Sequence, residues 1–167
     1  MIWMITGGAR SGKSSFAQNT ALTFSQSPIY VATAQQWDGD FQDRIKRHQS
    51  DRDERWTTIE EQKFVGSLAI DNQTVVIDCA TLWLTNFFVE EKNDIDICLE
   101  KAKIEIDLLA QKAGNFIFIT NELGMGLHAE TAIGRKFTDL QGWVNQYLAK
   151  KATKVTLMVS GIPLSVK

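Results

Sequence analysis

The sequence is poor in cysteine, in long apolar runs and in net charge, and each shortage excludes a class of protein. Its two cysteines, Cys79 and Cys98, are too few for a disulfide framework, and their spacing is not that of metal ligands. Both are therefore predicted to be reduced, structural thiols. No apolar stretch approaches the roughly 20 residues of a membrane span, so we expect no stable membrane insertion and a cytoplasmic protein. The formal net charge of -2 argues against nucleic acid as a partner.

Internal repeats, low-complexity tracts and linkers are also missing, so the 167 residues predict one domain, 1–167. Short apolar runs rich in β-branched residues predict strands at 1–5, 29–33, 74–78, 116–120 and 154–160. Because these runs are apolar throughout, we expect both faces of the sheet to be covered. The pattern predicts a three-layer α/β domain with a mostly parallel sheet and with ligands at the C-terminal ends of the strands.

Apolar residues at helical spacing separate several of these strands. They are Ala17, Thr20, Ala21 and Phe24; then Ile95, Cys98, Leu99, Ala102, Ile106, Leu109 and Ala113; and finally Phe137, Leu140, Val144, Tyr147 and Leu148. Gly114 follows the second set and is expected to cap its helix. Residues 34–60 are polar and rich in charge, which favours an excursion over the active face.

A phosphate-binding loop stands between the first strand and the first helix. The pattern is Gly7-x-x-x-x-Gly12-Lys13-Ser14, in which backbone N–H groups face phosphate oxygens, the lysine reaches the terminal phosphates and the serine binds Mg²⁺. The strand-loop-helix context predicts a nucleoside triphosphate site. The residues of this nucleotide-binding loop are Gly7, Gly8, Ala9, Arg10, Ser11, Gly12, Lys13 and Ser14.

Asp78 ends the third apolar run, "TVVID", and is the expected partner of Ser14 at the metal. A carboxylate at a strand tip beside a phosphate loop holds Mg²⁺ directly or through water. The alternative is that Asp78 caps the helix that follows.

The excursion contains a cationic cluster around one histidine. The middle of residues 38–60 is expected to be helical, so Arg44 and His48 share a face, with Arg52 one turn farther if the helix persists. Three interpretations stay open: a solvated helix of mixed charge, the arginine-bearing lid of a small-molecule kinase, or a covalent role for His48, because a neutral imidazole can attack phosphorus.

Several blocks along the whole chain resemble one family. In order and spacing, "TGGARSGKS", "YVATAQ", "RIKRH", "RWTTIE", "DCATLWLTN", "NELGMG", "GRKFTDLQGWVNQYLA" and "VSGIPL" are similar to the bifunctional adenosylcobinamide kinase and adenosylcobinamide-phosphate guanylyltransferase family of cobalamin biosynthesis. The resemblance implies a RecA-like P-loop NTPase fold, often assembled as a trimer. It also implies GTP and ATP as substrates, phosphorylation of adenosylcobinamide, and GMP transfer to adenosylcobinamide phosphate through a GMP-histidine intermediate.

The resemblance assigns site residues by motif. His48 takes the place of the family's catalytic histidine, with Lys13 also catalytic, and Asp78 stands where some relatives have a glutamate. The implied nucleotide contacts beyond the phosphate loop are Ala32, Thr33, Ala34, Ser50, Asp51, Arg52, Asp53, Glu60 and Asp78. The other histidine, His128, is expected to be an ordinary surface or packing residue.

Two further classes of protein carry phosphate loops but need features that this sequence does not show. A GTPase switch needs a guanine-reading Asn-Lys-x-Asp segment, which the sequence lacks, and a RecA-like DNA motor needs a basic DNA-binding surface. A small-molecule kinase with an arginine-bearing lid and no guanylyl transfer is the main alternative. The sequence does not distinguish ATP from GTP as the phosphoryl donor.

Overall fold

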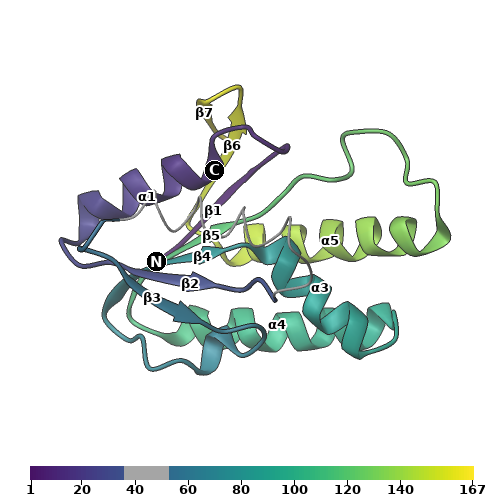
Figure 1. Ribbon diagram of the computed structural model, residues 1–167, viewed down its shortest axis with the longest axis horizontal. Helices are drawn as coiled ribbons and strands as arrows, with labels where there is room; N and C mark the ends of the chain where they lie inside the picture. The colour runs from purple at the N-terminus through teal and green to yellow at the C-terminus, as the bar shows by residue number, and fades with distance from the viewer. Residues whose placement is uncertain (36–52) are drawn as a thin grey trace.

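The computed structural model describes residues 1–35 and 53–167, and this part of the chain forms one seven-stranded sheet (Figure 1). The strands are β1 (Ile2–Gly7), β2 (Ile29–Ala32), β3 (Thr57–Glu60), β4 (Gln73–Asp78), β5 (Gly114–Ile119), β6 (Lys154–Val159) and β7 (Ile162–Ser165). Their order is β3-β2-β4-β5-β1-β6-β7, and all neighbours are parallel except β6 and β7. The predicted α/β class with a mostly parallel sheet is therefore confirmed.

Helices cover both faces of this sheet. They are α1 (Lys13–Phe24), α3 (Ala80–Glu90), α4 (Ile95–Gln111) and α5 (Ala132–Lys151), with a short 3-10 helix η1 (Val65–Ser67). α1 packs on one face, while α3, α4 and α5 pack on the other, which gives the three predicted layers (Figure 1).

The alternation of side chains along the strands divides the core in two. In β5, Phe116 and Phe118 face α3, α4 and α5, where they meet the fully buried Trp83, while Ile117 and Ile119 face α1. The larger cluster lies on the side of the three helices and contains most of the buried aromatic side chains. α1 presents small buried residues such as Ala17 instead, which lets this helix lie close to the sheet.

Two strands and one helix boundary differ from the sequence predictions. β3 and β7 were not predicted, because both are edge strands with polar or proline-containing sequences rather than continuous apolar runs. Gly114 does not cap α4: Lys112 does, and Gly114 opens β5 with a φ of 133°. Phe24, the last residue of α1, is 44% exposed, so the inward face of that helix ends before it.

The parallel strands place their C-terminal ends at one edge of the sheet. The segments that follow β1, β2 and β4 meet there: the phosphate loop, residues 33–35 and the Asp78–Cys79 pair. Ligands of open parallel α/β sheets bind at such an edge. Within the described chain, no helix combines the length and the apolarity needed to cross a membrane.

Candidate active site

The phosphate loop leads from β1 to the N-terminus of α1, and two glycines are required by its geometry. Gly7 has a φ of 148°, and a Cβ there would lie 2.5 Å from the backbone oxygen of Met158. Gly12 has a φ of 93° and lies against Gly161, 3.2 Å from the position of an added Cβ. Larger residues at either position would therefore meet both backbone strain and steric contact.

Neighbouring loops hold the phosphate loop in place through backbone hydrogen bonds. The N–H of Gly161, in the turn between β6 and β7, donates to the carbonyl of Ser11 at 3.0 Å. The N–H of Glu122, just after β5, donates to the carbonyl of Gly7 at 3.1 Å. The loop is thus tied to β5, β6 and β7 as well as to its own strand and helix.

Lys13 is a buried cation at the start of α1. It is only 7% exposed, and its Nζ donates a hydrogen bond to the carbonyl of Gly8 at 2.6 Å. Burial lowers the pKa of Lys13 from its ordinary value, while the neighbouring Cys79 and Asp78 side chains oppose this shift. A desolvated ammonium group next to the free N–H groups of a helix N-terminus is suited to binding phosphate.

The Asp78 carboxylate lies beside the phosphate loop and accepts two hydrogen bonds. Ser14 Oγ is 3.3 Å from Asp78 Oδ2, and the hydroxyl of Tyr30 is 2.5 Å from the same oxygen. Asp78 does not cap the next helix: the N-cap of α3 is Cys79, which makes no side-chain capping bond. The structure therefore brings together the two side chains predicted to bind Mg²⁺.

Cys79 lies next to this carboxylate, and its buried thiol has a raised pKa. Burial raises the pKa of Cys79 to about 12, and the neighbouring negative charge of Asp78 adds to the effect. Cys98 is also free and buried, and burial raises its pKa to about 11. Both cysteines are protonated at neutral pH, in agreement with the structural role predicted for them.

The residues after β2 are fixed against β4 and α3. The N–H of Thr33 donates to the carbonyl of Asp78 at 3.0 Å, and its hydroxyl donates to the carbonyl of Cys79 at 2.9 Å. The buried Asn86 on α3 donates to the carbonyl of Thr33 at 2.8 Å. Ala32 and Ala34 flank Thr33, so these three predicted nucleotide contacts lie beside the carboxylate.

Other predicted site residues lie farther out or beyond the described chain. Glu60 ends β3 in register with Ala32 and is exposed. Asp53 is paired with Arg55 at 2.6 Å, and the pKa of Asp53 is lowered by its hydrogen bonds to Arg55. The predictions for Arg44, His48, Ser50, Asp51 and Arg52 fall on residues outside those described.

A buried amide network follows β5 and positions the segment "NELGMG". Gln141 on α5 donates to the hydroxyl of Thr120 at 2.9 Å, and that hydroxyl donates to Asn145 at 2.7 Å. Asn145 in turn donates to the carbonyl of Asn121 at 3.1 Å. In sequence, these α5 residues stand out only as part of a family block, because amides on a helix carry no signal for a contact with a strand end. His128, farther along the same connection, is exposed, as expected.

Tyr30 was also missed as a site residue. In sequence, Tyr30 is only one residue of the predicted strand "IYVAT", and a tyrosine is common in strands. The sequence carried no signal for the contact, because Tyr30 is the second residue of its predicted strand and Asp78 is the last residue of another. Only the pairing of those two strands brings the side chains together.

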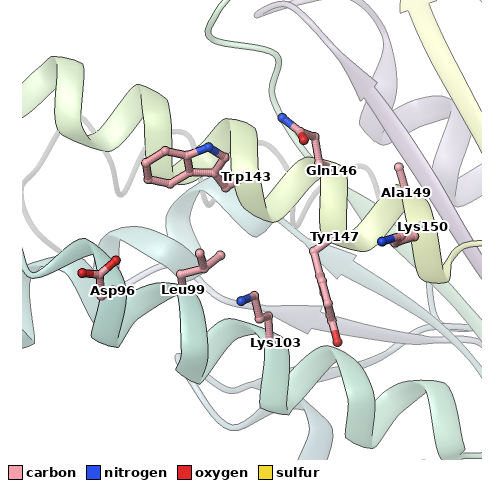
Figure 2. A pocket seen from close by; sticks show the side chains of 8 residues that line it. All are labelled: Asp96, Leu99, Lys103, Trp143, Gln146, Tyr147, Ala149 and Lys150. Carbon is pink, nitrogen blue, oxygen red and sulfur yellow. The ribbon is translucent and has the colours of Figure 1, made fainter.

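A separate groove of about 730 Å³ lies between α4 and α5 (Figure 2). Its lining residues come from both helices: Asp96, Leu99, Lys103, Trp143, Gln146, Tyr147, Ala149 and Lys150. These helices cover the sheet face opposite α1, and none of the residues predicted for the nucleotide site lines the groove. The groove is therefore distinct from the phosphate-loop site.

Comparison with known proteins gives full-length similarities. Residues 3–166 match the family model described as CobU, cobinamide kinase / cobinamide phosphate guanyltransferase. The chain is 33% identical over 169 residues to the bifunctional adenosylcobalamin biosynthesis protein CobP of Pseudomonas aeruginosa, covering 98% of this chain and 96% of that protein. It is 35% identical over 182 residues to the bifunctional adenosylcobalamin biosynthesis protein CobU of Escherichia coli, with 100% of both chains covered. The protein of the same name from Salmonella typhimurium is 34% identical over 183 residues, again with 100% of both chains covered.

Proposed function

The chain belongs to the cobinamide kinase / cobinamide phosphate guanyltransferase family, and on this basis we propose how its phosphate loop and His48 share two reactions. The protein is a bifunctional enzyme of cobalamin biosynthesis that phosphorylates adenosylcobinamide and transfers a guanylyl group to the resulting phosphate. The observation that carries the proposed division of roles is the cluster of Lys13, Ser14 and Asp78 around one phosphate loop.

We propose that Ser14 and Asp78 hold Mg²⁺. The donors fit this ion, because a hydroxyl and a carboxylate oxygen, both hard ligands, lie 3.3 Å apart at the loop. Residues 1–35 and 53–167 contain no group of three or more His, Cys, Asp or Glu side chains able to hold a metal. The remaining ligands of the proposed Mg²⁺ are substrate phosphates and water. When bound, Mg²⁺ supplies neutralisation of the charge that develops on phosphate oxygens.

A bound triphosphate forms hydrogen bonds with loop groups that bond to other protein groups in its absence. Lys13 exchanges its bond to the Gly8 carbonyl for bonds to the terminal phosphates, and the first N–H groups of α1 face the phosphate oxygens. Ser11 Oγ is buried and has no hydrogen-bond partner among the described residues, which leaves it available to the ligand. The remaining nucleotide contacts are proposed at the tips of β2 and β3, where Ala32, Thr33 and Ala34 lie near Glu60, and at Asp53 after it leaves Arg55.

The kinase step requires positioning and charge neutralisation rather than a covalent intermediate. The aminopropanol hydroxyl of adenosylcobinamide attacks the γ-phosphorus of ATP or GTP. The bond between that phosphorus and the bridging oxygen breaks, the nucleoside diphosphate leaves, and the hydroxyl proton is released. Lys13 stabilises the negative charge that accumulates on the leaving diphosphate.

The guanylyl step uses His48 as a nucleophile. Its neutral imidazole attacks the α-phosphorus of GTP, pyrophosphate leaves, and a phosphoramidate forms. The phosphate of the cobinamide substrate then attacks the same phosphorus and displaces the imidazole, giving adenosylcobinamide-GDP. A free imidazole has a pKa of about 6.5, so such a group is mostly neutral at slightly alkaline pH. The support for His48 is its place in the "RIKRH" block, where the family has its catalytic histidine.

Labelled GTP tests this assignment. After incubation with Mg²⁺ and GTP labelled at the α-phosphorus, the denatured protein should retain label that is labile to acid and stable to base. Label at the γ-phosphorus should not be retained through this linkage. His48→Ala should abolish the adduct, while His128→Ala, the matched change at the exposed histidine between β5 and α5, should leave it unchanged.

The same experiment separates the second candidate function. A small-molecule kinase with a lid carrying Arg44 and Arg52 forms no guanylyl adduct and releases no pyrophosphate when cobinamide phosphate is added. If the unmodified protein forms no adduct even when pyrophosphate is removed, the kinase-only function replaces the proposed one. If the α-label survives His48→Ala undiminished, another residue carries the guanylyl group.

We also propose that the enzyme is a cytoplasmic homo-oligomer, with a trimer favoured by the family resemblance. β7 is an edge strand whose apolar side chains are open, with Ile162 63% and Leu164 49% exposed, and Val166 beyond it is 65% exposed. Such an edge is usually covered in soluble proteins. Light scattering at micromolar concentration tests the assembly, and a monomer would refute it. The cytoplasm is proposed because both steps consume nucleoside triphosphates.

A further inference from the structure

Tyr30 and Asp78 lie on neighbouring strands in a register that aims the tyrosine at the carboxylate. β2 and β4 are parallel, with Tyr30 paired to Val76 and Ala32 paired to Asp78. Because side chains alternate, Tyr30, Val76 and Asp78 all point to the face covered by α1. Asp78 is thus the diagonal neighbour of Tyr30, a separation that a long aromatic side chain can span. The Tyr30 hydroxyl reaches Asp78 Oδ2 at 2.5 Å.

The phenol ring is held by packing, so its hydroxyl has a defined position. Tyr30 is 3% exposed and belongs to the core cluster beneath α1, together with Ala17 and Val76. The Trp56 ring packs edge-on against the Tyr30 ring, with centroids 6.1 Å apart and planes at 81°. A ring enclosed in this way cannot turn its hydroxyl away from the carboxylate without disturbing the core.

The carboxylate that Tyr30 holds is also in contact with the phosphate loop. Asp78 Oδ2 accepts from both Tyr30 and Ser14, so the tyrosine and the loop serine bracket one oxygen atom. An aspartate side chain rotates about two bonds, and each rotation moves its oxygens relative to Ser14. A second donor to the same oxygen, on a side chain fixed in the core, reduces this freedom.

We propose that Tyr30 is a positioning residue that orients the Asp78 carboxylate for divalent-cation binding with Ser14. The inference rests on the proposed metal site of the enzyme and adds to it the residue that holds the ligand in place. Partners that orient metal ligands typically contribute 10–100-fold to metal affinity. We expect about a 10-fold effect, since one of the two hydrogen-bond donors to Asp78 Oδ2 is removed.

The test compares GDP binding by calorimetry in excess Mg²⁺ and in excess EDTA, using the full chain. The dissociation constant in EDTA divided by the dissociation constant in Mg²⁺ gives the factor by which the cation strengthens GDP binding. Tyr30→Phe keeps the ring and removes the hydroxyl, so the ratio should fall about 10-fold while the affinity in EDTA stays unchanged. Asp78→Asn removes the negative charge of the proposed ligand, so it should lower the ratio at least as much.

The second tyrosine of the chain provides a matched control. The hydroxyl of Tyr147 on α5 donates to both carboxylate oxygens of Asp107 on α4, at 2.9 and 2.8 Å, on the sheet face opposite α1. Tyr147→Phe therefore removes the same kind of bond at a distance from the nucleotide, and it should change neither binding constant. Thermal unfolding of both variants measures the loss of stability that each substitution causes.

Three results would overturn the inference, and they are distinguishable. If Asp78→Asn lowers the ratio and Tyr30→Phe does not, Tyr30 has no part in orienting the carboxylate. If Tyr30→Phe weakens binding equally in Mg²⁺ and in EDTA, its role is structural. If Asp78→Asn leaves the ratio unchanged, the proposed metal site is itself wrong, and the inference fails with it.

Discussion

Replacing Lys13 with alanine should weaken GTP binding strongly while the fold remains. The lysine is the buried cation of the phosphate loop, and its ammonium group is already directed into the loop at the Gly8 carbonyl. Hydrogen bonds that involve a charged group contribute about 1.5–3 kcal/mol. The loss therefore corresponds to a rise of about 10- to 150-fold in the dissociation constant for GTP.

The fold should survive because two effects of the substitution oppose each other. The variant loses one hydrogen bond, with a net contribution of about 0.5–1.5 kcal/mol to the free energy of unfolding. It also loses a charge that folding desolvates: burial lowers the pKa of Lys13, so below that pKa the protonated lysine makes the folded state less stable than a neutral residue would. We expect the free energy of unfolding to change by about 1 kcal/mol or less.

A thermal-shift assay with GTP and Mg²⁺ measures both quantities. At a GTP concentration 100 times the dissociation constant, ligand binding stabilises the unmodified protein by about 2.7 kcal/mol, which raises its Tm by about 5–11 °C. A variant that binds 100-fold more weakly gains only about 0.4 kcal/mol, a shift of about 1–2 °C.

The control variant is Lys112→Ala. Lys112 pairs with Asp71 near the other end of the strands, so this variant should show the full GTP-induced rise in Tm. A full GTP-induced shift in a folded Lys13→Ala variant would refute the phosphate-loop assignment.

Three further predictions follow from the same structure. Gly7→Ala should destabilise the protein by about 2 kcal/mol or more, measured by urea unfolding, because the residue has a φ of 148° and a Cβ there lies 2.5 Å from a backbone oxygen of β6; a stability equal to that of the unmodified protein would contradict this. Cys79 and Cys98 should react with a thiol reagent at pH 8 only after denaturation, since their raised pKa values of about 12 and about 11 keep both protonated; rapid labelling of the native protein would show otherwise. Asp107→Asn should remove part of the stability at pH 6, because Lys151 lowers the pKa of Asp107. A carboxylate with a lowered pKa contributes stability above its ordinary pKa, and that stability is lost as the pH falls through the pKa of the folded state. The acid-unfolding curves of the two proteins should therefore converge once the pH lies below the folded-state pKa of Asp107.

Much of the nucleotide site could be predicted because it is written in one short segment. The loop from Gly7 to Ser14 depends on local requirements: a positive φ at Gly7 and Gly12, a cation at Lys13 and a hydroxyl at Ser14. The five main strands were equally accessible, since strands buried on both faces are apolar throughout. Asp78 could be placed beside the loop because parallel strands end at a common edge.

What escaped prediction depends on contacts between distant segments. Nothing in "IYVAT" indicates that Tyr30 meets Asp78, because that contact requires β2 and β4 to be neighbours and Tyr30 to pair with Val76. The edge strands β3 and β7 were missed for a related reason: an edge strand has one paired side only, so its sequence need not be continuously apolar.

The fold class, the phosphate loop and the family could all be predicted, since each depends on residue type and spacing within short blocks. The tertiary structure decided how the loop is supported, through the hydrogen bonds that Gly161 and Glu122 donate to it. It also decided which side chains surround the Asp78 carboxylate. The physical reason is that strand order and register arise from packing of the whole core, so residues 48 positions apart, such as Tyr30 and Asp78, become neighbours only when the chain has folded.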